Sequence, residues 1–178
     1  MSTAASPFPS EAIRRIVLMG VAGCGKSAVG AALAARLGAA YLDGDDLHPQ
    51  ANIDKMSRGA ALSDEDRWPW LTLVGEKLAA PDGILVLGCS ALKRRYRDHI
   101  RKEAGAPVLF VHLAGSRKLI AARMAARAGH FMPASLIDSQ FAALEPPEKD
   151  EHAMTIDIDR PPERIVDDIV THLEESLP

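Results

Sequence analysis

Cysteine, excess positive charge and long apolar runs are all scarce in this sequence, and each shortage excludes a class of protein. The 178 residues include 2 cysteines in no CxxC or Cys/His pattern, which argues against a disulfide scaffold or a zinc site. The net charge of -3 leaves no basic excess to neutralise nucleic-acid phosphates. No apolar run approaches the ~18 residues of a membrane span. We therefore expect a cytoplasmic protein that binds neither nucleic acid nor membrane.

The chain length favours a single folded unit. Residues 1–12, MSTAASPFPSEA, lack the apolar centre of a signal peptide and are predicted to form a flexible tail. Residues 13–178 are enough for one domain with a sizeable core and too few for two.

Short apolar runs alternate with helix-like segments along the chain. RRIVLMG, PDGILVLGCS and APVLFVHLAG are typical of strands buried on both faces of a parallel sheet, and AAYLD and MTIDID are weaker candidates. Helices are predicted at residues 26–37, 64–79, 91–104, 117–127, 133–144 and 161–177. This alternation predicts an α/β fold of three layers around a five-stranded parallel sheet. Ligands should then collect in the loops at the carboxyl ends of the strands.

A glycine-rich loop joins the first predicted strand to the first predicted helix. Its residues 20–27, GVAGCGKS, fit the pattern G-x-x-x-x-G-K-[ST]. In this pattern backbone N–H groups surround phosphates, the lysine reaches the β- and γ-phosphates, and the hydroxyl can bind Mg²⁺. The alternative is a plain turn with a surface lysine. The predicted nucleotide-binding residues here are Gly20, Val21, Ala22, Gly23, Cys24, Gly25, Lys26, Ser27 and Ala28.

Three carboxylates crowd the segment DGDDLHP, residues 43–49, after the second predicted strand. The segment could be a solvated acidic loop, but not a calcium loop, because Leu47 stands where the third ligand is required. Beside a nucleotide, one carboxylate could hold Mg²⁺ and another could accept the proton of an attacking hydroxyl. Strand alternation would point Asp43 and Asp45 the same way. We expect Ser27, Asp43 and Asp45 to hold the metal and Asp45 to act as the base.

A nucleotide-dependent switch is the main alternative to an enzyme. It would need a guanine-binding N-K-x-D or T-K-x-D motif. The single asparagine, Asn52, precedes isoleucine, and no threonine precedes a lysine. A D-x-x-G switch motif is also missing, so the sequence favours an enzyme.

Longer stretches of the chain resemble the gluconokinase family, small P-loop kinases related in fold to shikimate and nucleoside-monophosphate kinases. The resemblance covers most of residues 16–147. Its most specific parts are DGDDLHP followed by NIDKM, and CSALK with YRD. The other matching stretches are GVAGCGKSAVGAALAARL, SRGAALSDEDRWPWL and RMAARAGHFMPASLIDSQFAALEPP.

This resemblance implies a P-loop kinase fold with a small mobile lid at about residues 123–135. It implies ATP and Mg²⁺ as cofactors, and phosphorylation of D-gluconate at its C6 hydroxyl to give 6-phosphogluconate. The family is commonly dimeric, so a homodimer is expected. Another small-metabolite kinase, acting on shikimate or a nucleoside monophosphate, is the alternative enzyme.

Basic residues near the strand ends are candidates for holding the carboxylate of gluconate. Because arginine can grip a carboxylate with two parallel hydrogen bonds, we expect Arg67, Lys93 and Arg97 to bind the acid. The alternative for KRRYR is the solvated face of a helix, which we prefer for Arg95. His48 could bind a sugar hydroxyl or merely cap its loop.

Arg123 and Arg127 lie four residues apart and so share one face of a predicted helix. The following AGHFMP contains a glycine and a proline, which mark a mobile segment. A lid in kinases of this shape excludes water and adds positive charge around the transferring phosphoryl group. We expect both arginines to contact the nucleotide, and His130 to contact substrate from the lid. Two surface arginines are the alternative. The predicted catalytic residues are Lys26, Asp45 and Arg127.

Overall fold

A computed structural model describes residues 13–127 and 134–176. Its centre is a five-stranded sheet in the order β2-β3-β1-β4-β5, in which every neighbouring pair is parallel. The predicted α/β fold with a five-stranded parallel sheet is therefore confirmed. The strands are β1 (Arg15–Met19), β2 (Ala40–Asp43), β3 (Leu85–Gly88), β4 (Leu109–Ala114) and β5 (Ala153–Asp157).

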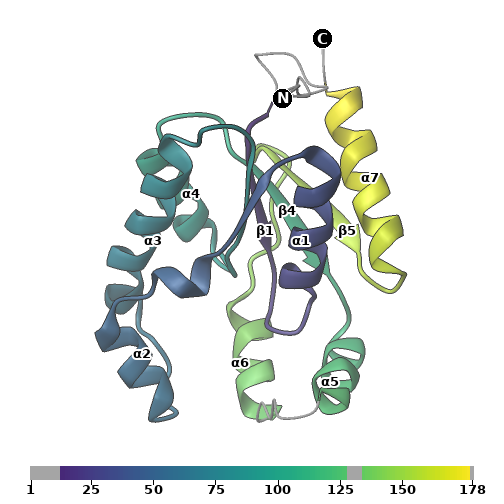
Figure 1. The fold of residues 1–178 in the computed structure, drawn as a ribbon. Coiled ribbons are helices and arrows are strands. Elements are labelled where there is room, and N and C mark those ends of the chain that lie inside the picture. The colour runs from purple at the N-terminus through teal and green to yellow at the C-terminus, as the bar shows by residue number, and fades with distance from the viewer. Residues whose placement is uncertain (1–12, 128–133, 177–178) are drawn as a thin grey trace.

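Helices on both faces of the sheet complete the three layers (Figure 1). They are α1 (Lys26–Leu37), α2 (Gln50–Ser57), α3 (Asp64–Ala79), α4 (Arg94–Ala104), α5 (Arg117–Ala126), α6 (Ala134–Ala143) and α7 (Pro162–Glu175). Helices α1 and α7 share one hydrophobic core, and α3 and α4 share the other. Helices α5 and α6 lie beyond the carboxyl ends of the strands (Figure 1).

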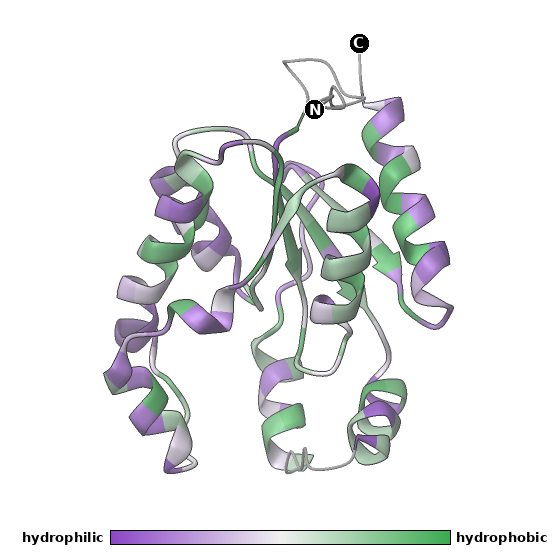
Figure 2. Ribbon diagram, viewed as in Figure 1, coloured by the Kyte–Doolittle hydropathy of each residue, from purple (hydrophilic) through white to green (hydrophobic). Residues whose placement is uncertain are grey.

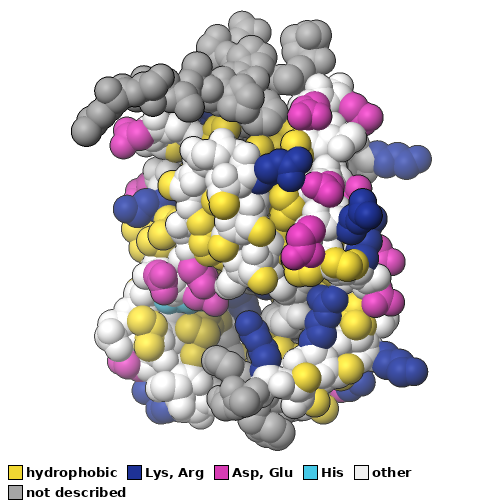
Figure 3. Space-filling model, turned by 45° about the vertical axis from the view of Figure 1, so that its right-hand side comes forward, with side chains coloured by type: hydrophobic (Ala, Val, Ile, Leu, Met, Phe, Trp, Pro, Cys, Tyr) yellow, Lys and Arg dark blue, Asp and Glu magenta, His cyan; other side chains and the backbone are white. Residues whose placement is uncertain are grey.

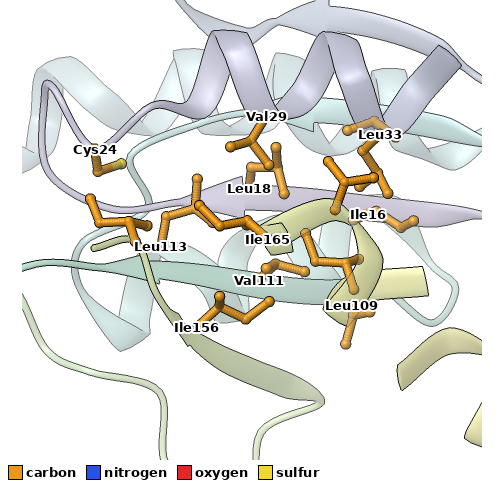
Figure 4. Packing of buried hydrophobic residues seen from close by; sticks show 14 of the residues in the cluster. Ile16, Leu18, Cys24, Val29, Leu33, Leu109, Val111, Leu113, Ile156 and Ile165 are labelled. Atoms are coloured by element: carbon orange, nitrogen blue, oxygen red, sulfur yellow. The ribbon is translucent and has the colours of Figure 1, made fainter. Parts of the chain in front are cut away.

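The central strand β1 explains why the strands are apolar on both faces. Ile16 and Leu18 belong to the core beneath α1 and α7, whereas Val17 and Met19 belong to the core beneath α3 and α4. All four side chains are fully buried, and burying such a side chain stabilises the fold by about 1.5–3 kcal/mol. Figure 4 shows Leu18 beneath Val29 of α1 and Ile16 beneath Leu33 of the same helix. In Figure 2 the strands are largely hydrophobic, while the helices carry hydrophilic residues outward.

Two helices have the predicted bounds because their ends carry clear capping signals. At the end of α1, Gly38 adopts the left-handed conformation and its N–H donates to the carbonyl of Ala34. At the start of α3, the Ser63 hydroxyl accepts from the N–H of Asp66 while the Asp66 carboxylate accepts from the N–H of Ser63. This reciprocal capping box fixes the first turn of the helix.

Elsewhere the helix bounds depart from the predicted ones. Helix α4 begins at Arg94 instead of residue 91, because Ala91 has a φ of 43° and Lys93 is extended. The segment predicted as a loop forms a short 3₁₀ helix, η1 (Gly44–Leu47), and α2 was not predicted. Both elements are short and polar, so neither carries a strong apolar period.

Among the helices of the described residues, none is both long and apolar enough to cross a membrane. The flexible tail at residues 1–12 and the single domain at 13–178 stay predictions. The lid at about residues 123–135 also stays a prediction, because residues 128–133 lie outside the described part of the chain.

Candidate active site

The glycine-rich loop lies between the carboxyl end of β1 and the start of α1 (Figure 1). Gly25 is the residue before the helix, with a φ of 97° that a residue bearing a side chain rarely adopts. No side chain caps α1 at this end. The N–H groups of its first turn are therefore available to an anion at the positive end of the helix.

The ammonium group of Lys26 lies against this loop. Its Nζ donates to the carbonyl oxygens of Gly20, at 3.0 Å, and Val21, at 3.1 Å. Phosphate oxygens would be stronger acceptors for the same ammonium, because they carry negative charge and the carbonyl oxygens do not. A loop with uncapped amides and a lysine held over it fits a polyphosphate.

Asp43 and Asp45 do come together, but not for the predicted reason. The prediction that strand alternation aligns them is wrong, because β2 ends at Asp43 and Asp45 belongs to the 3₁₀ helix η1. Instead, Asp43 caps that helix, and its Oδ1 accepts from the N–H of Asp45 at 3.0 Å. Pairing of Asp43 with Gly88 places both beside the end of β3.

The environment of Asp45 suits a group that exchanges a proton. Its side chain is 78% exposed, so a substrate can reach the carboxylate. Its pKa is raised above the usual 3.8, chiefly by partial desolvation and then by the charge of Asp43, while Lys26 opposes the shift. Because Lys26 belongs to the glycine-rich loop, its effect on this pKa means that the carboxylate and the ammonium lie within electrostatic range of each other.

Tyr41 is a residue of the site that sequence analysis missed. Its hydroxyl is buried beside Ser27 and finds no hydrogen-bond partner among the described residues. Burial raises the pKa of this phenol, the adjacent Ser27 hydroxyl opposes that effect, and the charges of Asp43 and Asp45 add to it. An apolar-looking strand residue gives no sequence signal for this position.

The metal prediction depends on groups outside the protein. Within residues 13–127 and 134–176, no cluster of three or more His, Cys, Asp or Glu side chains could hold a metal by itself. Ser27 is exposed at the start of α1, near the buried Tyr41 hydroxyl. A hydroxyl and two carboxylates fit Mg²⁺ when nucleotide phosphates and waters supply the remaining oxygens.

A cationic cluster surrounds the ring of Tyr96. The charged groups of Arg67, Lys93 and Arg95 lie 5.6, 5.7 and 5.9 Å from the ring centroid. The Tyr96 hydroxyl donates to Asp64, which also accepts from Arg95 and lies 3.6 Å from Lys93 Nζ. The hydrogen bond from Tyr96, followed by the nearby cations, lowers the pKa of Asp64. Two of the three predicted acid-binding residues, Arg67 and Lys93, therefore lie together.

Arg97 does not join them, and its prediction as a substrate ligand needs correction. Its side chain is fully buried and forms two hydrogen bonds with Glu151, of 2.7 and 2.8 Å. Its remaining donors reach the carbonyl oxygens of Ala91 and Leu92. Position in the sequence could not reveal this, because Glu151 lies 54 residues away. Arg97 has a structural role.

The structural alternative is also favoured for His48. Its side chain is 5% exposed and stacks on Trp70 with ring centroids 4.1 Å apart. Asn52 Nδ2 donates to the Asp66 carbonyl, which identifies it as the amide nitrogen. The same nitrogen lies 3.2 Å from His48 Nδ1 and can only donate there, so Nδ1 is the acceptor. The imidazole proton is then on Nε2, 4.0 Å from Asp45 Oδ1. His48 therefore supports the loop that carries Asp45.

The two arginines of the predicted lid lie at the end of α5. Arg123 donates to the carbonyl of Ile158, just after β5, at 2.7 Å. Arg127 is exposed at the last residue before the undescribed segment. The prediction for His130 lies outside the described residues.

The described groups lie along the carboxyl edge of the sheet, because the glycine-rich loop follows β1, Asp45 follows β2 and Lys93 follows β3. The charge of Lys26 acts on Asp45, Asp45 adjoins His48, and the charge of Arg67 lowers the pKa of His48 after the larger effect of burial. Figure 3 shows Lys and Arg side chains at the rim of a hollow in the lower half of the molecule. Such a site can hold an anionic substrate between a phosphate loop and a cluster of cations.

Comparison with known proteins agrees with this chemistry. Residues 16–147 match the family model described as an AAA domain. The chain is 52% identical over 139 residues to the thermosensitive gluconokinase of Escherichia coli (strain K12), which covers 76% of this chain and 73% of that protein. It is 44% identical over 165 residues to the gluconokinase of Gluconobacter oxydans (strain 621H), covering 90% of this chain and 92% of that protein.

A solved structure extends the similarity to three dimensions. The crystal structure of a gluconokinase from Sinorhizobium meliloti 1021 superposes with a TM-score of 0.84 at 46% identity, covering 90% of this chain and 91% of that one. The chain therefore belongs to the gluconokinase family.

Proposed function

We infer that this chain is an ATP-dependent gluconokinase, which converts D-gluconate to 6-phospho-D-gluconate and ADP and so brings gluconate into central carbohydrate metabolism. The observation that supports this inference is that the phosphate loop, Asp45 and Lys93 of the cationic cluster all follow strands at the carboxyl edge of the sheet. Membership of the gluconokinase family supports the same substrate.

In the proposed reaction the loop of residues 20–27 holds the ATP phosphates, with Lys26 on the β- and γ-phosphates. Asp45 orients the C6 hydroxyl of gluconate and accepts its proton. The hydroxyl oxygen forms a bond to the γ-phosphorus while the bond from that phosphorus to the β–γ bridging oxygen breaks, and ADP leaves. Catalysis then comes mainly from positioning and from stabilisation of charge.

Arg67 and Lys93 hold the carboxylate of gluconate in this proposal. The two cations are preorganised by Tyr96 and Asp64, so little side-chain freedom is lost when the acid binds. His48 acts through Asp45, and Arg97 is left out of the binding set. Arg123 and Arg127 are proposed to contact the nucleotide phosphates, with Arg127 stabilising the transferring group.

Ser27, Asp43 and Asp45 are the residues that would hold Mg²⁺, directly or through water. The ion would neutralise negative charge on the nucleotide. Tyr41, beside Ser27, provides a buried hydroxyl that could accept or donate a hydrogen bond once the site is filled.

A coupled assay of ADP release tests the function. Purified protein with Mg·ATP is offered gluconate, other aldonates, shikimate and nucleoside monophosphates at equal concentrations. We expect the highest kcat/KM with gluconate and a product phosphorylated at C6, as determined by phosphorus–proton NMR coupling.

The other outcomes discriminate between the alternatives. Turnover of shikimate or a nucleoside monophosphate without turnover of gluconate would support another small-metabolite kinase of the same fold. Nucleotide binding without phosphoryl transfer to any acceptor would support a nucleotide-dependent switch. The sequence disfavours this outcome, because it contains no N-K-x-D or T-K-x-D guanine-binding motif.

We further propose that the enzyme works in the cytoplasm as a homodimer. The cytoplasmic proposal rests on its use of ATP and on two buried cysteines that remain free thiols. The dimer rests on the family resemblance. Light scattering of the purified protein measures the oligomeric state directly.

A further inference from the structure

A side chain outside the glycine-rich motif holds the phosphate loop. The backbone N–H of Ala22, in the outer turn of the loop, donates to Oε1 of Gln140 at 2.6 Å. The two residues are 118 positions apart, and the bond is partly buried. Gln140 belongs to α6, so this contact joins the loop to a helix that lies beyond the carboxyl ends of the strands (Figure 1).

Helix α6 is fixed independently of this bond. Ile137 is 5% exposed and belongs to the core shared by α1 and α7. After the helix, the N–H of Glu145 donates to the carbonyl of Leu92 at 2.7 Å, and its carboxylate accepts from the N–H of Arg94 at 2.8 Å. Because α6 is held at both places, Gln140 presents a fixed acceptor to the loop.

Helix α5 closes the other side of the same turn. A Cβ atom on Gly23 would lie 2.6 Å from Sδ of Met124, so the loop backbone approaches α5 as closely as glycine allows. The outer turn of the loop, residues 21–24, is therefore confined between Met124 of α5 and Gln140 of α6.

We propose that Gln140 is a positioning residue for nucleotide binding, which fixes the outer turn so that the following N–H groups converge on the phosphates. The proposal rests on the proposed function only in taking the ligand to be a nucleoside di- or triphosphate. Ala22 itself need not touch the ligand, because its N–H is already satisfied by Gln140. Without that acceptor, the partly buried N–H must find another partner, and the turn can rearrange.

The test compares Gln140→Met with Gln140→Glu. Methionine keeps the length and helix propensity of glutamine but removes the acceptor. Glutamate keeps an acceptor at the same reach but adds a negative charge near the phosphates. Measurements in about 1 M KCl, where the Debye length is about 3 Å, screen that charge while leaving the hydrogen bond intact. Ser139→Ala, at an exposed neighbouring position on α6, is the matched control.

The primary readout is the Kd for Mg·ADP by calorimetry, without gluconate, which keeps this test separate from the identity of the acceptor. We expect Gln140→Met to weaken ADP binding about fivefold, both at low salt and in about 1 M KCl. This factor corresponds to the loss of a hydrogen bond worth about 1 kcal/mol. Gln140→Glu in high salt and Ser139→Ala should bind within about twofold of the wild type. Steady-state assays should show a raised KM for ATP, with kcat and the KM for gluconate little changed.

Two results would overturn the proposal. One is wild-type affinity for Mg·ADP in Gln140→Met. The other is equal weakening in Gln140→Met and Gln140→Glu at high salt, which would make the loss a packing effect. Failure of the wild type to phosphorylate gluconate, with the expected ADP affinities, would refute the substrate and leave the role of Gln140 intact.

Discussion

At the scale of single residues, Lys26 carries the largest share of the proposed electrostatics. Its ammonium lies 3.0 and 3.1 Å from two loop carbonyl oxygens and can exchange these acceptors for phosphate oxygens when a nucleotide binds. We expect Lys26→Ala to lower kcat about 10²–10³-fold, as for loss of one preorganised charge-stabilising group. The coupled ADP-release assay measures this loss. Lys77→Ala, at an exposed position on α3, serves as the control, and a Lys26→Ala enzyme with most of its activity would refute the phosphate role.

Asp45 governs how the rate depends on pH. A base must be ionised to accept a proton, so activity should fall as the pH drops through the pKa of Asp45, which is raised above 3.8. We expect the acid limb of the kcat/KM profile, which reports the free enzyme, to lie above that value. Asp45→Asn should lower kcat about 10²–10⁴-fold, with a smaller effect on the KM for ATP.

The neighbouring Asp46→Asn provides the control for this prediction, because Asp46 is exposed on the same 3₁₀ helix. It should keep most of the rate and an acid limb shifted slightly lower, because the charge of Asp46 is a minor contributor to the raised pKa of Asp45. An unchanged kcat in Asp45→Asn would remove Asp45 from the role of base.

At the scale of elements, the buried pair of Arg97 and Glu151 ties α4 to the segment before β5. Both side chains have no exposed surface. We expect Arg97→Met to destabilise the protein by about 3–5 kcal/mol, because it leaves a buried carboxylate with only Arg101 nearby. Urea unfolding measures this loss. Arg94→Met, at a partly exposed ion pair on α4, should cost much less. The KM for gluconate of folded Arg97→Met should be unchanged, and a large rise would restore Arg97 to the substrate site.

The same pair predicts a pH dependence of stability. Burial of Glu151 raises its pKa, but hydrogen bonds from Arg97 and from the N–H of Glu148 outweigh that effect and lower the pKa from 4.5 to about 2. A carboxylate whose pKa is lower in the folded state than in the unfolded chain stabilises the folded state at pH values above its unfolded-state pKa. The contribution should be complete above pH 4.5 and lost as the pH falls toward about 2. A free energy of unfolding that depends equally on pH in wild type and Arg97→Met would contradict this.

Predictability at this scale depends on whether the signal is local. Helix α3 is predictable because Ser63 and Asp66 are three residues apart and cap each other. Helix α2 and the 3₁₀ helix before it could not be predicted in this way. Their conformation depends on contacts with distant residues, such as the hydrogen bond from Asn52 to the carbonyl of Asp66. The role of Arg97 could not be predicted either, since nothing near it in the sequence marks Glu151 as its partner.

At the scale of the whole molecule, nucleotide binding should be linked to stability. A ligand at about 100 times its Kd stabilises the folded state by about 2.7 kcal/mol, which raises Tm by about 5–10 °C for a chain of this size. We expect Mg·ADP to produce this shift in thermal unfolding. Lys26→Ala should show a smaller one at the same concentration. A wild type whose Tm is unaffected by Mg·ADP would refute the nucleotide site.

The sequence by itself determined the parallel sheet, the phosphate loop and the family, because apolar runs, glycine spacing and contiguous motifs are local properties of the chain. Only the tertiary structure decided which basic residues can meet a substrate. It brought Arg67 and Lys93 together around Tyr96, buried Arg97 against Glu151, and placed Gln140 on the phosphate loop. These pairings join residues far apart in sequence, and folding selects them by burial and hydrogen bonding, which the chemical type of a residue does not specify.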